Sequence, residues 1–153
     1  MKIAVCSDEL YSIHDLCVQE LTRRGHEVIA FGAIKTRQDQ NWACVAKEAA
    51  LAVSAGFCNE GIFFCYTGTG ISIAANKIPG IRAALCSDAK TAIDARIWND
   101  ANVLALSNRL TSSDILKEIL EAWFSKPDKK PGLIGVNELN KIDSEFRNPA
   151  QRL

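Results

Sequence analysis

Short apolar runs alternate with amphipathic segments along most of this chain. Each run holds consecutive hydrophobic residues between glycine or polar residues, which is typical of a buried strand. The runs span residues 2–6, 27–31, 61–65, 81–86 and 101–106. The segments that follow them carry apolar residues three and four positions apart, which is the spacing of one helix face. These segments span residues 10–24, 42–55, 70–78, 88–98 and 112–124.

The five predicted strands are apolar at neighbouring positions and not only at alternate ones. Strands of this kind are buried on both faces, as in a parallel sheet that helices cover on each side. Right-handed crossovers between successive parallel strands then distribute the helices over the two faces. The expected fold is α/β, a three-layer α/β/α domain with a five-stranded parallel sheet.

The character of the chain changes after residue 124. Residues 125–132 form a polar segment with three lysines and two prolines, and residues 136–146 have helical spacing. The last residues, 148–153, are expected to fray. We therefore expect a domain over residues 1–124, and a linker with a C-terminal helical tail over residues 125–153. Two interpretations of the tail stay open: it packs on a partner subunit, which we favour, or it is loosely packed.

Composition narrows the possible functions. The 153 residues fit one domain. Basic and acidic residues both number 18, so the basic excess typical of nucleic-acid-binding proteins is absent. No apolar stretch approaches the length of a membrane span, and the first residues have no signal-peptide layout. The six cysteines include no C-x-x-C pair, so no zinc or thiol-redox motif is indicated. We expect a cytoplasmic protein with no nucleic-acid or membrane partner.

Cys65 differs from the other cysteines because it ends a predicted strand just before a glycine-rich turn. Thr67, Gly68 and Gly70 belong to that turn, and helical spacing begins directly after it. Unpaired amide N–H groups at a helix start carry partial positive charge and attract anions. A base beside such donors is what proton transfer next to a carbonyl requires. The structural alternative is a buried thiol followed by a tight turn that needs glycine.

Two segments resemble the ribose-5-phosphate isomerase B family, which also contains the A and B subunits of galactose-6-phosphate isomerase. They are residues 65–85, CYTGTGISIAANKIPGIRAAL, and residues 99–106, NDANVLAL. The similarity extends in order over about residues 1–124. It implies a Rossmann-like domain that interconverts aldose and ketose phosphates through an enediolate, with no metal and no organic cofactor. It also implies a homodimer or dimer of dimers with active sites at the subunit interface.

The resemblance implies roles for the matching positions. Cys65 matches the cysteine base that moves a proton between C1 and C2, and Thr67 matches the threonine that assists it. Asp8 matches an acid near the sugar, Asn99 an asparagine that contacts substrate, and Arg109 an arginine that helps to bind phosphate. The amides that hold the enediolate oxygen are matched by Gly68, Thr69, Gly70 and Ile71.

Several positions depart from the family pattern. Glu9 and Trp98 stand where the family usually has histidines associated with ring opening and with phosphate or sugar contacts. Tyr66 replaces a glycine, and residues 131–137 supply none of the family's phosphate-binding tail arginines. We interpret Glu9 as a general acid/base or as an acceptor for sugar hydroxyls, and Trp98 and Tyr66 as residues that line the substrate pocket. The structural alternatives are a solvated loop acid and core or interface aromatics.

The expected activity is isomerisation of a small sugar phosphate of the ribose 5-phosphate type. A tetrose phosphate forms no stable furanose and needs no ring-opening acid, so the missing histidines also fit such a substrate. A hexose phosphate, or a non-catalytic sugar-phosphate-binding or partner subunit, are further alternatives. A nucleotide-binding module is disfavoured because the glycine turn follows the third strand and not the first. His14 and His26 are expected at the surface and not as catalysts.

Overall fold

A five-stranded parallel sheet forms the centre of the molecule, as the apolar runs predict. The computed structural model describes residues 1–147. The strands are β1 Lys2–Ser7, β2 Glu27–Gly32, β3 Glu60–Cys65, β4 Ala83–Leu85 and β5 Val103–Ser107. Their order across the sheet is β2-β1-β3-β5-β4, and every neighbouring pair is parallel.

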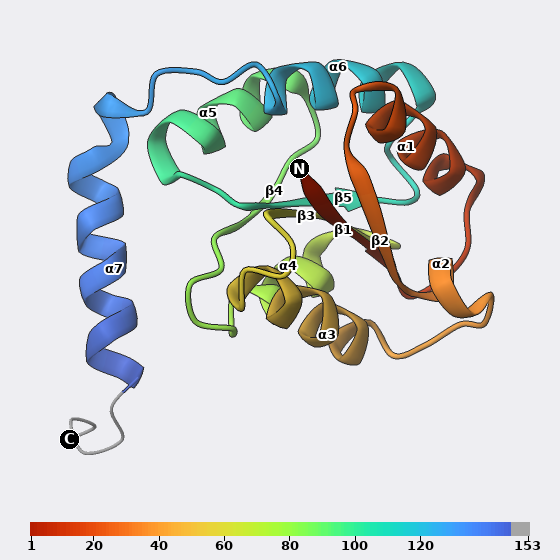
Figure 1. The fold of residues 1–153 in the computed structure, drawn as a ribbon, viewed down its shortest axis with the longest axis horizontal. Coiled ribbons are helices and arrows are strands. Elements are labelled where there is room, and N and C mark those ends of the chain that lie inside the picture. The colour runs from red at the N-terminus through yellow and green to blue at the C-terminus, as the bar shows by residue number, and fades with distance from the viewer. Residues whose placement is uncertain (148–153) are drawn as a thin grey trace.

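Helices cover both faces of this sheet. They are α1 Ser12–Arg23, α2 Ala33–Thr36, α3 Trp42–Ser54, α4 Thr69–Ala75, α5 Ala89–Asn99, α6 Ser113–Trp123 and α7 Leu133–Arg147. Helices α1, α5 and α6 lie on one face, and α3 and α4 lie on the other (Figure 1). The three-layer α/β/α prediction is therefore confirmed.

Each face of the sheet has its own apolar cluster. Ile62 and Phe64 of β3 pack in the cluster below α1, α5 and α6. Phe63 and Cys65 pack in the cluster against α3 and α4. Because successive strand residues point to opposite faces, a strand buried on both sides must be apolar at every position. This requirement explains the unbroken apolar runs in the sequence.

Polar side chains start three of the helices that follow the strands. Asn41 accepts hydrogen bonds from the amides of Ala43 and Cys44 at 3.0 and 3.3 Å. The carboxylate of Asp88 caps α5 in the same way. Ser112 accepts from the amide of residue 115 at 3.3 Å and starts α6. Each such cap stabilises its helix by about 1 kcal/mol.

Strand β4 is shorter than the predicted run over residues 81–86, and two helices also differ from the predicted ones. The short helix α2 was not expected, because its four residues are too few to show a period. Helix α7 begins at Leu133 and not at residue 136, directly after a 3-10 turn over Lys130–Gly132 that carries Pro131 near its start. Proline is favoured there because its fixed φ suits the first helical positions. The predicted fraying of residues 148–153 lies outside the described residues.

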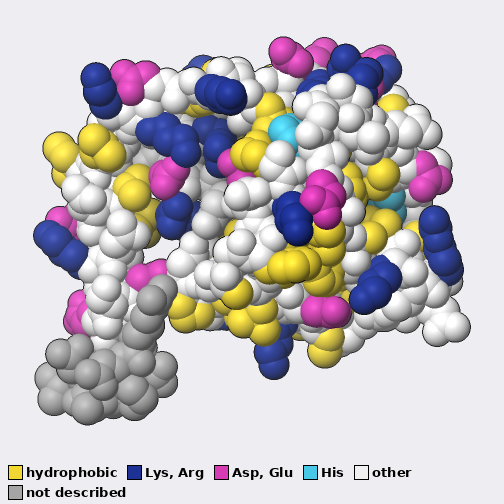
Figure 2. Space-filling view, viewed as in Figure 1, with side chains coloured by type: hydrophobic (Ala, Val, Ile, Leu, Met, Phe, Trp, Pro, Cys, Tyr) yellow, Lys and Arg dark blue, Asp and Glu magenta, His cyan; other side chains and the backbone are white. Residues whose placement is uncertain are grey.

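Helix α7 stands beside the β4 edge of the sheet and away from the three layers (Figure 1). In Figure 2 a hollow separates much of α7 from the rest of the molecule. The helix nevertheless carries large hydrophobic side chains that are exposed in the single chain: Leu133, Ile134, Leu139, Ile142 and Phe146.

Candidate functional site

The carboxyl ends of β1 and β3 lie side by side at the centre of the sheet. From here the chain passes from β1 to β2 on one side and from β3 to the outermost strand β4 on the other, and β5 then lies between β3 and β4. Ser7 pairs with Phe64 in register, so Asp8 and Cys65 follow at the same level. Cys65 also pairs with Ser107 of β5. Ligands of open α/β sheets bind at such a switch point.

The glycine-rich turn begins directly after Cys65. Gly68 has a φ of +77°, and a Cβ atom there would lie 2.5 Å from Leu85 Cδ1 and 3.0 Å from the backbone of Leu106. Only glycine fits this conformation and this space. The hydroxyls of Thr67 and Thr69 are 2.7 Å apart and hydrogen bonded. Because α4 begins at Thr69, its first amides have no acceptor within the helix.

Cys65 closes the buried strand, with 5% of its surface exposed. Its carbonyl accepts a hydrogen bond from the amide of Asn108 at 2.9 Å. Two other thiols lie near this edge, and burial raises the pKa of Cys6 well above its usual value and the pKa of Cys86 to about 12. Both therefore stay protonated at neutral pH and are unsuited to act as bases.

A cavity of about 220 Å³ opens beside the glycine-rich turn. Its lining residues are Thr67, Leu85, Cys86, Ser87, Ser107, Leu110 and Thr111. Cys65 is not among them, because it packs in the apolar cluster on the α3 and α4 face of the sheet. The lining residues nearest to it along the chain and across the sheet are Thr67 and its strand neighbour Ser107. On the opposite side of the turn, the Trp42 ring packs against Gly70, where an added Cβ would lie 3.1 Å from Cε3 of the ring.

Two acidic side chains follow β1 at this edge. Asp8 is buried, and its Oδ1 atom accepts no hydrogen bond from the described part of the chain. Burial first, and then the charge of Glu9, raises the pKa of Asp8 above its usual value. Glu9 accepts a hydrogen bond from the Tyr11 hydroxyl at 2.9 Å. A buried oxygen without a partner is costly in the free protein and is suited to accept a ligand hydroxyl.

Tyr66 and Arg109 are exposed at the same edge. The Arg109 amide donates to the Tyr66 carbonyl at 3.2 Å, and its guanidinium lies 5.9 Å from the centre of the Tyr66 ring. The structure thus brings ten of the predicted site residues to the carboxyl ends of the strands: Asp8, Glu9, Cys65, Tyr66, Thr67, Gly68, Thr69, Gly70, Ile71 and Arg109. Of these, Ile71 turns its side chain into the core and has only its backbone to offer.

The other two predicted site residues are Trp98 and Asn99. They lie at the opposite end of the strands, where the parallel strands begin. They end α5 and precede β5, and the nearby Asn102 carbonyl accepts a hydrogen bond from the amide of Gly61 at the start of β3. Gly61 and Cys65 are four strand residues apart, which is about 13 Å. A single chain therefore does not bring Trp98 or Asn99 to Cys65.

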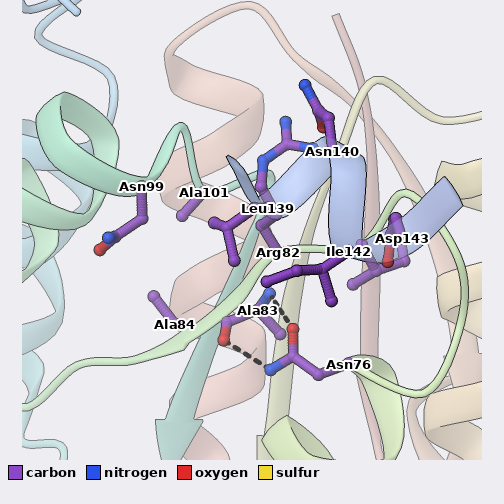
Figure 3. A pocket seen from close by; sticks show the side chains of 11 residues that line it. Asn76, Arg82, Ala83, Ala84, Asn99, Ala101, Leu139, Asn140, Ile142 and Asp143 are labelled. Atoms are coloured by element: carbon purple, nitrogen blue, oxygen red, sulfur yellow. Dashed lines mark hydrogen bonds between the residues drawn. The ribbon is translucent and has the colours of Figure 1, made fainter. Parts of the chain in front are cut away.

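Asn99 instead lines a cavity of about 330 Å³ between α7 and the rest of the molecule (Figure 3). Arg82 also faces this cavity and is held by Asp100, whose carboxylate and carbonyl accept from its guanidinium at 2.8 Å each. Asn76 is bound to the backbone of Ala83 by two hydrogen bonds of 2.8 Å, drawn as dashed lines in Figure 3.

The prediction that His14 lies at the surface is wrong. The residue is only 1% exposed, and its Nε2 atom lies 2.8 Å from Oδ1 of Asn108. The sequence did contain a signal, because His14, Cys17 and Leu21 are three and four positions apart on the buried face of α1. His26 is partly buried, and its ring packs on Phe124 with 4.5 Å between centres.

Residues 1–147 contain no group of three histidine, cysteine or acidic side chains that could hold a metal ion. Within the same residues, no helix is both long enough and apolar enough to cross a membrane.

Comparison with known proteins indicates one family. The family model described as Ribose/Galactose Isomerase matches residues 3–139. Ribose-5-phosphate isomerase B of Escherichia coli is 42% identical over 124 residues, or 80% of this chain and 82% of that protein. D-erythrulose-4-phosphate isomerase of Pectobacterium atrosepticum is 35% identical over 124 residues, with 80% and 82% covered. The solved structure of ribose-5-phosphate isomerase B from Clostridium thermocellum has a TM-score of 0.84 at 36% identity, and covers 95% of this chain and 99% of that one.

Proposed function

This chain belongs to the ribose/galactose isomerase family, and from that premise we propose that it interconverts an aldose phosphate and a ketose phosphate by proton transfer at Cys65. Membership makes it a sugar-phosphate isomerase. The thiol mechanism rests on one observation: Cys65 ends β3 at the switch point of the sheet, beside the loop after β1 that carries Asp8 and directly before the turn at Gly68.

In this mechanism the Cys65 thiolate takes a proton from the carbon next to the substrate carbonyl. The electron pair moves onto the carbonyl oxygen, and the amides from Gly68 to Ile71 donate to the enediolate oxygen. Thr67 assists the transfer of a proton between the two oxygens. The thiol then returns its proton to the neighbouring carbon, so the reaction needs no external oxidant or reductant.

The remaining residues bind the substrate. Asp8 accepts a substrate hydroxyl through its unpartnered Oδ1 atom, and Glu9 acts on the next hydroxyl as an acid/base or acceptor. Arg109 binds the phosphate, and the exposed Tyr66 ring beside it lines the substrate pocket.

Trp98 and Asn99 reach the site from a second copy of the chain. Their position at the far edge of the sheet supports this arrangement, because neither can contact Cys65 of its own chain. The exposed apolar side chains of α7, such as Ile134, support packing of the tail on the same partner. The active form is then a homodimer or a dimer of dimers.

A tetrose phosphate is the second candidate substrate. Glu9 and Trp98 occupy the two positions where the family resemblance predicts histidines associated with ring opening and with phosphate or sugar contacts, and a tetrose phosphate has no stable furanose ring to open. A relative that is 35% identical bears the name D-erythrulose-4-phosphate isomerase, which supports the same candidate. Comparable turnover of ribose 5-phosphate and allose 6-phosphate would contradict it.

Solvent-deuterium incorporation tests the mechanism. The protein is incubated in D2O with ribose 5-phosphate or D-erythrulose 4-phosphate, and NMR follows the proton on the carbon beside the carbonyl. Exchange should occur in the unmodified protein and fall by about 10²-fold or more in Cys65→Ala, the usual scale for loss of a proton-transfer group. The matched control is Cys44→Ala, which removes an exposed thiol of α3. Binding without exchange would leave only the non-catalytic alternative.

A further inference from the structure

A buried histidine joins the loops of the candidate site, although the proton transfer does not use it. His14 lies on α1 and contacts Asn108, which follows β5. We propose that His14 and Asn108 are positioning residues that hold Glu9 and the Cys65 strand end in one arrangement, with the His14 ring neutral and protonated on Nε2. The kinetic part of this inference rests on the proposed function.

The contacts of His14 determine its tautomer. Its Nδ1 atom lies 3.2 Å from the backbone amide of Tyr11, and an amide N–H can only donate. Nδ1 must therefore carry a lone pair. The neutral ring then has its proton on Nε2, which donates to Oδ1 of Asn108 at 2.8 Å. A second proton on Nδ1 would set two donors against each other.

Tyr11 links His14 to Glu9 through hydrogen bonds. The Tyr11 carbonyl also accepts from the amide of His14 at 3.1 Å, so Tyr11 is bound to His14 at both its amide and its carbonyl. With its backbone held, the Tyr11 hydroxyl donates to Glu9 at 2.9 Å. This bond raises the pKa of Tyr11, so the hydroxyl keeps its proton and remains the donor.

Asn108 links His14 to the ends of β1 and β3 through hydrogen bonds. Its Nδ2 atom donates to the Ser7 hydroxyl at 3.3 Å, at the end of β1. Its backbone amide donates to the carbonyl of Cys65 at 2.9 Å, at the end of β3. Loops that are 94 residues apart in the chain from α1 to β5 therefore share one buried network.

The surroundings of His14 favour the neutral ring. The Phe64 ring packs on it with 4.9 Å between centres, and the Tyr11 ring lies at 6.0 Å. Burial lowers the pKa of His14, against smaller opposing effects of the Asn108 bond and of the Asp15 charge. Asp15 is the charged residue that acts on it most directly, and it is exposed on α1 itself.

The first test reads the tautomer of the unmodified protein. Nitrogen-15 NMR of the His14 ring at pH 7 should show a protonated Nε2 and an unprotonated Nδ1. A proton on Nδ1, or a doubly protonated ring, would overturn the proposal. This reading is independent of catalytic activity and of any variant.

The second test compares three variants. His14→Leu keeps the volume and loses both ring hydrogen bonds, whereas His14→Gln offers an amide N–H near the position of Nε2. His26→Leu is the matched control, because it removes the other histidine from its packing against Phe124 at the far edge of the sheet. We expect kcat to fall about 10- to 100-fold in His14→Leu with KM little changed, as for a misaligned catalytic group. His14→Gln should recover most of kcat, and His26→Leu should retain it.

Hydrogen exchange separates failure of this proposal from failure of the proposed function. In His14→Leu, amide exchange should become faster in residues 8–11, 65–69 and 107–110 together, and His26→Leu should leave these three loops unchanged. If the unmodified protein turns over no sugar phosphate, the proposed function fails while this comparison still decides the positioning role. Unchanged exchange in a folded His14→Leu, or unchanged kcat in an active one, would overturn the proposal.

Discussion

Gly68 and Gly25 share a left-handed backbone but differ in their surroundings. Their φ angles are +77° and +78°, yet an added Cβ meets Leu85 and Leu106 at Gly68 and nothing within 4 Å at Gly25. A side chain would therefore strain the backbone at both positions, but it would collide with neighbouring atoms only at Gly68. The pair makes it possible to measure the two costs separately.

We predict that Gly25→Ala lowers the free energy of unfolding by about 1 kcal/mol, the cost of a left-handed alanine. Gly68→Ala should lower it by about 2 kcal/mol more, because the turn must also move away from Leu85. Urea denaturation of both variants measures the difference. Equal losses in the two variants would show that the turn accommodates a side chain and that close packing does not select glycine there.

Asp8 gives the protein a pH dependence of known sign. Burial raises its pKa above the usual value of 3.8, so the folded state holds this proton more tightly than the unfolded chain does. The stabilisation that the proton provides is present at low pH and is lost as the pH rises from about 4 through the folded-state pKa. At neutral pH a buried charge remains.

Asp8→Asn should therefore unfold at a higher urea concentration than the unmodified protein at pH 7. We expect a gain of about 1 kcal/mol in the free energy of unfolding, the common scale of single substitutions. The gain should shrink as the pH falls below the usual Asp pKa of 3.8, because the Asp8 carboxyl is then protonated in both the folded and the unfolded protein. A gain that is the same at pH 7 and at about pH 3 would contradict the buried-charge explanation.

At the scale of elements, Glu60 connects three parts of the fold. It stands at the start of β3 and accepts from Arg96 of α5 at 2.6 Å and from the Trp123 indole of α6 at 2.7 Å. The Arg96 guanidinium also stacks over the Trp123 ring at 4.8 Å. The side chains of the ion pair are 11% and 12% exposed. This cluster holds α5 and α6 against the start of β3, at the end of the strands opposite the candidate site.

Glu60→Gln should destabilise the protein by about 3 kcal/mol, because it leaves the Arg96 charge buried without its partner. The matched control is Glu138→Gln on α7, whose pair with Lys141 is 60% and 71% exposed. That exposed pair should be worth less than about 0.5 kcal/mol. Thermal or urea unfolding measures both, and similar losses in the two variants would contradict the prediction.

At the scale of the whole molecule, the predicted site residues are divided between the two ends of the parallel strands. Cys65 and Asp8 lie at the carboxyl ends of the strands, whereas Asn99 lies near their amino ends and lines the cavity beside α7. In a two-fold symmetric dimer, the carboxyl ends of the strands in one chain can meet the amino ends of the strands in its partner. The symmetry forms this contact twice, once for each chain. Subunit mixing tests this arrangement without a structure of the dimer.

Cys65→Ala and Asn99→Ala should each be inactive as pure proteins. After the two are unfolded together and refolded, half of the dimers contain one chain of each kind. In those dimers one of the two sites has both unaltered residues, so about a quarter of the original activity should return. The mixture of Cys65→Ala with Cys65→Ala,Asn99→Ala is the control and should stay inactive. No recovery in the first mixture would show that each chain builds its own site.

The pattern of this sequence predicted the strands, the main helices and the strand-end thiol correctly because these depend on local properties. A strand buried on both faces must be apolar throughout, and a left-handed turn such as that at Gly68 favours glycine. Periodicity missed α2, which is shorter than one reliable repeat. The same periodicity places His14 on the buried face of α1, which contradicts the prediction that this residue lies at the surface.

The sequence by itself determined the order of elements, the parallel sheet and the position of Cys65 at a strand end. The tertiary structure alone decided which distant residues meet. It brought His14 to Asn108 and Glu60 to Trp123, and it carried Asn99 away from Cys65. The physical reason is that periodicity and turn stereochemistry act within a few residues, whereas these contacts depend on how strands are ordered across the sheet.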